Sequence, residues 1–151
     1  VVELEIPARP DFLALARIVA SAVASTDSDL DDDRIADLRL AVSEVCTNAM
    51  EAHWRPLGRD LRQGSAGLDG KLVPPICMRC WARDDQIEVE VTDEGPGFEL
   101  DQVVAPPAAH DPTRLDFERG LGIPLIRVLA DEVDFHSTPT GTTVRMVLRS
   151  G

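Results

Sequence analysis

The stretch VTDEGPGF, residues 91–98, marks where a predicted strand gives way to a glycine-rich turn. Over residues 86–92 apolar and polar side chains alternate, which is the period of a half-buried strand. The strand ends in the carboxylate of Asp93, and Gly95 and Gly97 follow it, separated by a proline that restrains the backbone. Such a turn can approach another group closely. By itself, however, the pattern D-x-G-x-G is typical of an ordinary turn, so its role depends on the rest of the chain.

Periodicity on both sides of this turn predicts an α/β protein. Two helices should precede the central strands, and a third should follow Gly122 and begin near Pro124. Long irregular segments are expected over 57–74 and 94–119. We therefore expect one domain over residues 1–151, an α+β two-layer sandwich in which a mixed, mostly antiparallel sheet carries helices on one face. The predicted strands are 2–6, 76–82, 86–92, 132–137 and 142–148, and the first two helices are 11–25 and 29–55.

The composition excludes several classes of function. With 151 residues and 44% hydrophobic content, the chain can bury a core of its own. A formal net charge of −12 argues against nucleic acid as a partner, because phosphate binding needs clustered cations. No apolar run approaches the ~18 residues that span a bilayer, so we expect no membrane partner and a cytoplasmic location.

The cysteines and histidines lack the spacing of a metal site. Cys77 and Cys80 form a C-x-x-C pattern, but residues three apart on a strand point to opposite faces, and no second cysteine pair accompanies them. The three histidines share no ligand spacing. We expect the cysteines to serve in packing, and we expect no metal that is held by protein side chains alone.

The predicted helix 29–55 carries a polar pair at the border of its apolar side. At about 100° per residue, Glu44 and Asn48 lie one turn apart on the same side of the helix. A carboxylate and an amide in this position can together reach a ligand beneath the helix. Taken in isolation, the pair fits a solvated helix surface better. The apolar side consists of Leu38, Ala41, Val42, Val45, Ala49 and Ala52.

Four short motifs follow one another along the chain, each in its own structural context. They are Glu44 to Asn48 on a helix, 93–97 after a strand, 119–122 before a helix, and 141–143 at the start of the last strand. This order resembles that of the GHKL ATPases, whose α/β sandwich is called the Bergerat fold. Within that superfamily the chain is most similar to the anti-sigma serine kinases of bacterial partner-switching systems, over nearly its whole length. The similar segments are LRLAVSEVCTNAMEAH at 38–53, ERGLGIPLIRVLADEVDF at 118–135 and GTTVRMVL at 141–148.

The resemblance implies an adenine site around Asp93. An aspartate at the strand end accepts a hydrogen bond from the exocyclic amine of adenine, a contact that separates ATP from GTP. Gly95 and Gly97 would leave space for the base and let the following segment move. Thr142 matches the family threonine near the adenine and its bound water.

The resemblance also assigns residues to the phosphates, the metal and the chemistry. Gly120, Leu121 and Gly122 would bring backbone amides and the positive end of a helix to the phosphates. Asn48 would coordinate Mg²⁺ through its side-chain oxygen, with phosphate oxygens and waters completing the shell. Glu44 would be the general base that takes a proton from the attacking serine hydroxyl.

Two assignments stay open at this level. Arg119 and Arg114 are both candidates for the cation on the phosphates, and each fits a solvated surface charge as well. His53 follows Asn48 by five residues, whereas many family members place a histidine four residues after the asparagine. No role is therefore carried over to His53, which we expect to be a residue at the end of the helix.

The function implied by the resemblance is that of a homodimeric protein serine kinase that uses ATP and Mg²⁺. It would sequester a sigma factor and phosphorylate a STAS-like antagonist of the anti-sigma factor. Two alternatives remain, a catalytically weak, nucleotide-gated protein-binding module of the same fold and the ATP-binding part of a larger signalling kinase. A histidine kinase is the least favoured, because no helical segment with a phosphoacceptor histidine precedes the domain in this sequence.

Overall fold

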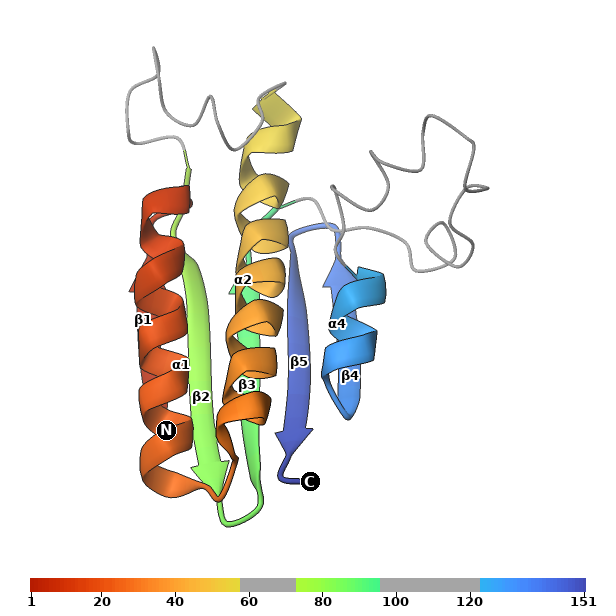
Figure 1. The fold of residues 1–151 in the computed structure, drawn as a ribbon. Coiled ribbons are helices and arrows are strands. Elements are labelled where there is room, and N and C mark those ends of the chain that lie inside the picture. The colour runs from red at the N-terminus through yellow and green to blue at the C-terminus, as the bar shows by residue number, and fades with distance from the viewer. Residues whose placement is uncertain (58–72, 96–122) are drawn as a thin grey trace, which may run out of the picture.

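The computed structural model describes residues 1–57, 73–95 and 123–151, which form one sheet with helices on one side (Figure 1). The sheet has five strands in the order β1-β2-β3-β5-β4. Every neighbouring pair of described strands is antiparallel. The predicted two-layer α/β sandwich is therefore confirmed, although these pairings are antiparallel throughout rather than mixed. The strands are β1 (Val2–Ile6), β2 (Ile76–Arg83), β3 (Gln86–Asp93), β4 (Glu132–Thr138) and β5 (Gly141–Arg149); the helices are α1 (Leu13–Asp27), α2 (Asp32–Trp54) and α4 (Ile123–Leu129), with short 3-10 turns η1 (Pro10–Phe12) and η2 (Arg55–Leu57).

Helix α2 begins later than the sequence predicted. The backbone of Asp31 is extended, and its side chain accepts a hydrogen bond of 2.8 Å from the amide of Arg34, so Asp31 is the N-cap and the predicted start at Asp29 is wrong. Asp32 and Asp33 then occupy the first turn, where their charges interact favourably with the positive end of the helix dipole. Among the helices in the described part of the chain, none combines the length and apolar character needed to cross a membrane.

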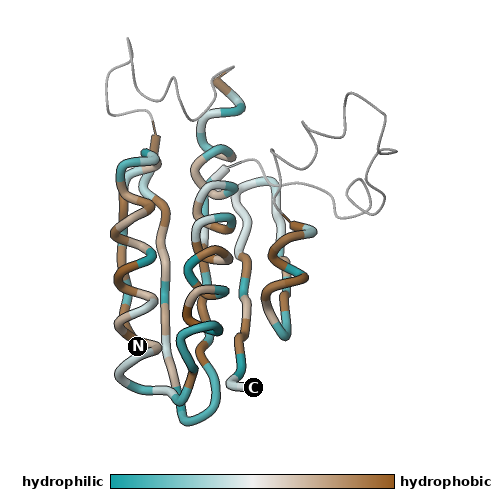
Figure 2. Tube along the Cα trace, viewed as in Figure 1, coloured by the Kyte–Doolittle hydropathy of each residue, from teal (hydrophilic) through white to brown (hydrophobic). Residues whose placement is uncertain are grey.

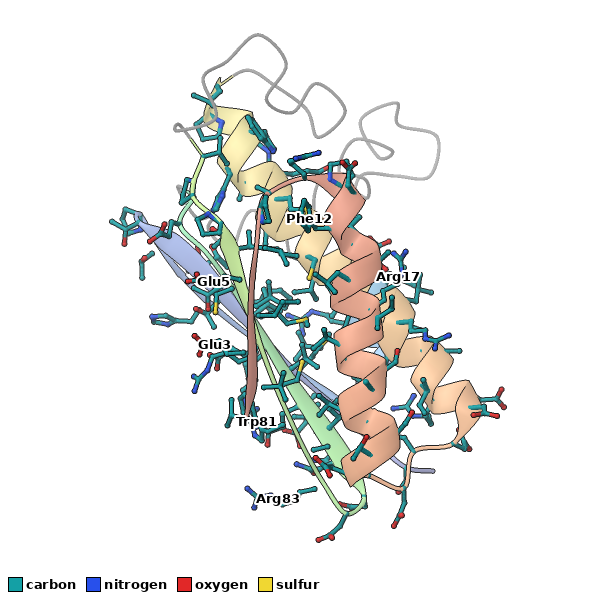
Figure 3. The ribbon with its side chains drawn as sticks, turned by 90° about the vertical axis from the view of Figure 1, so that its left-hand side faces the viewer. Glu3, Glu5, Phe12, Arg17, Trp81 and Arg83 are labelled. Atoms are coloured by element: carbon teal, nitrogen blue, oxygen red, sulfur yellow. The ribbon has the colours of Figure 1, made fainter. Side chains whose placement is uncertain are left out.

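The inner face of the sheet, which the helices cover, holds the core, whereas the outer face is polar. On β3 the side chains of Ile87, Val89 and Val91 are buried, and the residues between them are only half-buried. On the outer face, Glu3 and Glu5 of β1 point away from α1 (Figure 3). Along the chain, Figure 2 shows hydrophobic stretches in the strands and a hydrophilic turn between β2 and β3. The buried residues of α2 are Leu38, Ala41, Val42, Val45, Cys46, Ala49, Met50, His53 and Trp54.

The cysteines fall on different sides of the sheet, as their spacing predicted. Cys80 is buried on the inner face, and Cys77 lies half-buried on the outer face. Burial raises the pKa of Cys80 and of Cys46, on α2, to about 12. All three thiols are free, and the two buried ones behave as small apolar side chains.

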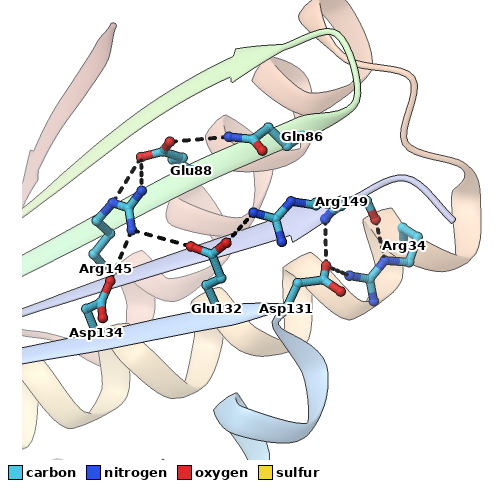
Figure 4. Close-up of polar contacts among 8 residues, drawn as sticks. All are labelled: Arg34, Gln86, Glu88, Asp131, Glu132, Asp134, Arg145 and Arg149. Atoms are coloured by element: carbon cyan, nitrogen blue, oxygen red, sulfur yellow. Dashed lines mark hydrogen bonds and ion pairs between the residues drawn. The ribbon is translucent and has the colours of Figure 1, made fainter.

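One end of the sandwich is tied together by the guanidinium of Arg34 in the first turns of α2 (Figure 4). Its Nε donates to the carbonyl of Arg149 at 2.9 Å, and Nη1 donates to the carbonyl of Leu129 at 3.2 Å and to Asp37 at 2.9 Å. Nη2 donates to the carboxylate of Asp131 at 2.6 Å, and the same carboxylate accepts from the backbone of Arg149 at 2.7 Å. These bonds join α2, the connection from α4 to β4, and the end of β5. We call this the Arg34 end.

Ion pairs extend from the Arg34 end over the outer face of the sheet (Figure 4). Arg145 of β5 donates to Glu88 of β3 at 3.0 Å and to Asp134 of β4 at 3.1 Å. Arg149 donates to Glu132 of β4. Each arginine of β5 thus bridges to a neighbouring strand and helps to fix the register of the sheet.

Candidate functional site

At the opposite end of the sheet from Arg34, polar residues replace apolar ones in the inner rows. Asp93 at the end of β3 lies directly across from Thr142 of β5, and Thr142 lies across from Ser137 of β4. Asp93 and Thr142 are only 6% and 4% exposed. The hydroxyl oxygens of Ser137 and Thr142 are 3.0 Å apart. The register therefore brings together Asp93 and Thr142, both named from the sequence, and adds Ser137, which was missed although it continues the alternation of β4.

The carboxylate of Asp93 is buried, and its hydrogen bonds and neighbouring charges only partly offset the cost of removing its negative charge from water. Its Oδ1 accepts a hydrogen bond of 2.8 Å from the amide of Gly95. Burial raises the pKa of Asp93, while the backbone amides of Gly95 and Thr142 and the nearby His53 and Arg55 act in the opposite direction. Because desolvation outweighs these contacts, a further N–H donor from a ligand would stabilise the ionised carboxylate.

Two glycines allow backbone segments to come close together around Asp93. A Cβ atom on Gly95 would lie 2.7 Å from the carbonyl oxygen of Ala52 in α2, which is closer than packed atoms come. A Cβ atom on Gly141 would collide with the carbonyl oxygen of Asp93 itself. Packing therefore requires a glycine at position 95, because the turn after β3 is pressed against α2, a contact that the sequence did not predict. Gly141 lets β5 begin directly beside Asp93.

Asn48 and Glu44 lie on the same side of α2 as Ala52, at increasing distance from the turn after β3. Glu44, Asn48 and Ala52 are successive residues at a spacing of four, so they follow one side of the helix. Ala52 packs on Gly95. At a rise of 1.5 Å per residue, Asn48 is about 6 Å and Glu44 about 12 Å farther along the helix axis. The three positions therefore form a line that begins at Ala52, beside the turn after Asp93, and runs along α2.

The carboxyl group of Glu44 has a raised pKa, a property that is useful in a general base. It is half-buried on α2. Burial raises the pKa of its carboxyl group above the ordinary value for glutamate. A carboxylate with a raised pKa accepts a proton more readily once it is ionised, which suits a general base.

His53, expected from the sequence only to lie at the end of the helix, is in contact with two segments beside the site. Its imidazole is 6% exposed. Its Nε2 accepts a hydrogen bond of 2.9 Å from the backbone amide of Glu94, and its Nδ1 lies 2.8 Å from the carbonyl oxygen of Pro74. A neutral imidazole has one donor and one acceptor nitrogen, so Nδ1 is the donor here. The histidine is more than a helix end, because it joins α2 to segments far away in the sequence.

Several residues named from the sequence lie outside the described residues, and their roles at the phosphates and the base stay predictions. They are Gly97, Arg114, Arg119, Gly120, Leu121 and Gly122.

The donor chemistry of Asn48 fits a magnesium ion that arrives with a nucleotide. Within the described ranges, no group of three histidine, cysteine, aspartate or glutamate side chains is arranged to hold a metal. A side-chain amide oxygen is a ligand that Mg²⁺ accepts, and this ion commonly takes one or two protein ligands and fills its shell with phosphate oxygens and waters.

Comparison with known proteins connects this arrangement to a family. The family model described as "Histidine kinase-like ATPase domain" matches residues 6–148. The chain is 34% identical to serine-protein kinase RsbW of Bacillus pumilus over an alignment of 149 residues. This alignment covers 96% of this chain and 83% of that protein. The chain is 32% identical over 148 residues to the protein of the same name from Bacillus subtilis, with 96% and 82% covered, and 30% identical over 138 residues to that of Listeria monocytogenes serotype 4a, with 89% and 78% covered. The chain therefore belongs to the histidine kinase-like ATPase domain family, among the relatives of the serine-protein kinases RsbW.

Proposed function

We propose that this protein is an ATP-dependent protein serine kinase whose adenine pocket is built around Asp93. The observation that carries the proposal is the buried carboxylate of Asp93, opposite Thr142 and beside a turn that packs on α2. The names of the relatives support the type of reaction, because each is a serine-protein kinase.

Asp93 would select adenine through the chemistry of the base. A carboxylate accepts the N–H of the exocyclic amine of adenine, whereas guanine carries a carbonyl oxygen at that position and would face the carboxylate with a second acceptor. Leaving a buried acceptor unpaired costs about 1–3 kcal/mol. The pocket should therefore discriminate against GTP without any direct clash.

Asn48 and Glu44 would act on the phosphate side of the nucleotide. Asn48 would hold a magnesium ion, which neutralises charge on the phosphate oxygens. Glu44 would take the proton of a serine hydroxyl while the oxygen of that hydroxyl attacks the γ-phosphorus. The bond between the γ-phosphorus and the bridging oxygen then breaks, and ADP leaves with the electron pair. The products are phosphoserine and ADP, and Glu44 carries the proton.

The partners of the kinase would be those of a partner-switching system. The resemblance of the sequence supports a sigma factor that the domain sequesters, a STAS-like antagonist that supplies the serine, and a homodimeric assembly. The acidic net charge of −12 makes a protein partner more suitable than a nucleic acid.

The proposal is tested by transfer of labelled γ-phosphate to purified STAS-like antagonists from the same organism. We expect Mg²⁺-dependent labelling of serine in one of them. Asn48→Ala should abolish magnesium-dependent nucleotide binding and labelling, whereas Thr47→Ala, a neighbouring half-buried position on α2, should retain both. Tight ATP binding with no phosphate transfer to any antagonist would contradict the proposed kinase activity and would favour a nucleotide-gated protein-binding module.

A further inference from the structure

The imidazole of His53 connects three segments that are distant in the sequence. It belongs to the last turn of α2, and its two nitrogens reach the carbonyl of Pro74 before β2 and the amide of Glu94 after β3. The Pro74 contact spans 21 residues of sequence and the Glu94 contact spans 41. Because the ring is buried, neither contact is easily replaced by water.

Glu94 lies in the middle of the turn that orients Asp93. On its amino-terminal side is Asp93, whose Oδ1 accepts from the amide of Gly95 at 2.8 Å. On its carboxyl-terminal side is Gly95, which packs on Ala52, the residue before His53. The turn is therefore held to α2 at two adjacent points, by the packing of Gly95 and by the hydrogen bond from Glu94 to the imidazole.

From these contacts we propose that His53 is a positioning residue for adenine recognition. By accepting the Glu94 amide, its Nε2 holds the turn in the orientation that directs the carboxylate of Asp93 into the pocket. His53 itself does not touch the nucleotide. This inference rests on the proposed function, since it assumes that Asp93 is the residue that binds the base.

The two hydrogen bonds of His53 can be separated by substitution. The side-chain oxygen of glutamine can occupy the position of Nε2 and accept the Glu94 amide, while the bond to Pro74 is lost. The side-chain nitrogen of asparagine can occupy the position of Nδ1 and donate to Pro74, while Glu94 is left without its acceptor. If His53 positions Asp93, only the asparagine variant should damage nucleotide recognition. If His53 only stabilises the fold, both variants should lose stability and neither should change the preference for adenine.

The experiment measures Kd for ADP and for GDP with Mg²⁺ by calorimetry, together with the free energy of unfolding in urea, on the complete chain. His53→Asn should weaken ADP binding about tenfold and reduce the preference for ADP over GDP, because the Glu94 amide is unpaired. His53→Gln should keep the ADP affinity within about threefold and retain the preference. His136→Asn, at an exposed histidine on β4, is the matched control and should change neither.

Each result decides between the two roles. Unchanged ADP affinity and base preference in a folded His53→Asn protein would overturn the inference, and so would an equal loss of affinity in both variants. Should His53→Asn be unfolded at room temperature, both affinities are measured at a lower temperature at which it is folded, and loss of ADP binding in folded His53→Gln would by itself overturn the assignment of Nε2. A wild-type protein that binds no ADP would instead refute the proposed function, so the two failures are distinguishable.

Discussion

The two ends of the sandwich satisfy their polar groups in different ways. At the Arg34 end, cations meet carboxylates and carbonyls, and Arg34 alone donates to four acceptors. At the opposite end, formed by Asp93, Thr142 and Ser137 and called the Asp93 end, the buried carboxylate of Asp93 is held by backbone amides, and burial raises its pKa. The first arrangement compensates its charges within the protein. The second leaves a cost of desolvation that a ligand can relieve, which is why one end should determine stability and the other should determine binding.

The largest expected effect is the loss of phosphoryl transfer when Glu44 is changed. Glu44→Gln should lower the transfer rate by about 10²-fold or more, because glutamine cannot accept the serine proton. Its folding should be intact, since the raised pKa means that ionised Glu44 does not stabilise the folded state. Glu5→Gln removes a charge from the exposed outer face of β1 and should transfer phosphate at the wild-type rate.

The rate should also depend on pH through Glu44. Only the ionised carboxylate accepts a proton, so transfer should fall as the pH is lowered through a value above the ordinary pKa of glutamate. This acid limb should be absent from the residual activity of Glu44→Gln. A wild-type rate of phosphoryl transfer in Glu44→Gln would show that Glu44 is an ordinary surface residue of α2 and not the general base. The assignment of the reaction to the side of the molecule away from the Arg34 end would then lose its support.

The next effect should appear at the Arg34 end and in stability alone. Arg34→Ala removes the donor of four hydrogen bonds, which leaves two carboxylates, Asp131 and the half-buried Asp37, and two carbonyl groups without it. We expect a loss of about 2 kcal/mol in the free energy of unfolding, measured in urea, with unchanged ADP affinity at a temperature where the variant is folded. Arg83→Ala, at an exposed position of β2, should cost less than about 0.5 kcal/mol. A fall in ADP affinity in Arg34→Ala would show that the two ends are coupled.

The counterpart at the Asp93 end should affect binding without reducing stability. Asp93→Asn should weaken ADP binding by about 1–3 kcal/mol, because a buried polar contact to the base is disturbed. A carboxyl group whose pKa is raised on folding favours the folded state below its unfolded pKa, and this contribution is lost as the pH rises through the folded pKa. At neutral pH the nucleotide-free Asp93→Asn protein should thus be no less stable than the wild type, and Asp85→Asn at the exposed turn serves as the control. A clear decrease in the free energy of unfolding of Asp93→Asn would mean that Asp93 stabilises the fold and is not a residue whose main role is to bind a ligand.

The sequence predicted the sheet well because strand alternation is a local property. All five strands lie within a residue or two of their predicted bounds. The start of α2 was less predictable, because Asp29, Asp31, Asp32 and Asp33 all suit a helix start and only the backbone of Asp31 decides which one caps it.

The site was predictable where it follows a motif and not where it depends on long-range contacts. Asp93 and Thr142 were named from the sequence, and the strand register brings them opposite each other. His53 could not be assigned, because Pro74 and Glu94 come to it only through folding. The packing of Gly95 on Ala52 was hidden for the same reason, since residues 41 to 43 positions apart show no pattern that links them.

The most direct test of the Asp93 end as an adenine site is a calorimetric titration of the wild-type protein with ADP and with GDP, each with Mg²⁺. We predict saturable binding of ADP and at least about tenfold weaker binding of GDP, from the cost of one unpaired buried acceptor. Absence of heat with ADP at millimolar concentration on folded protein, or equal affinity for the two nucleotides, would contradict the assignment of Asp93.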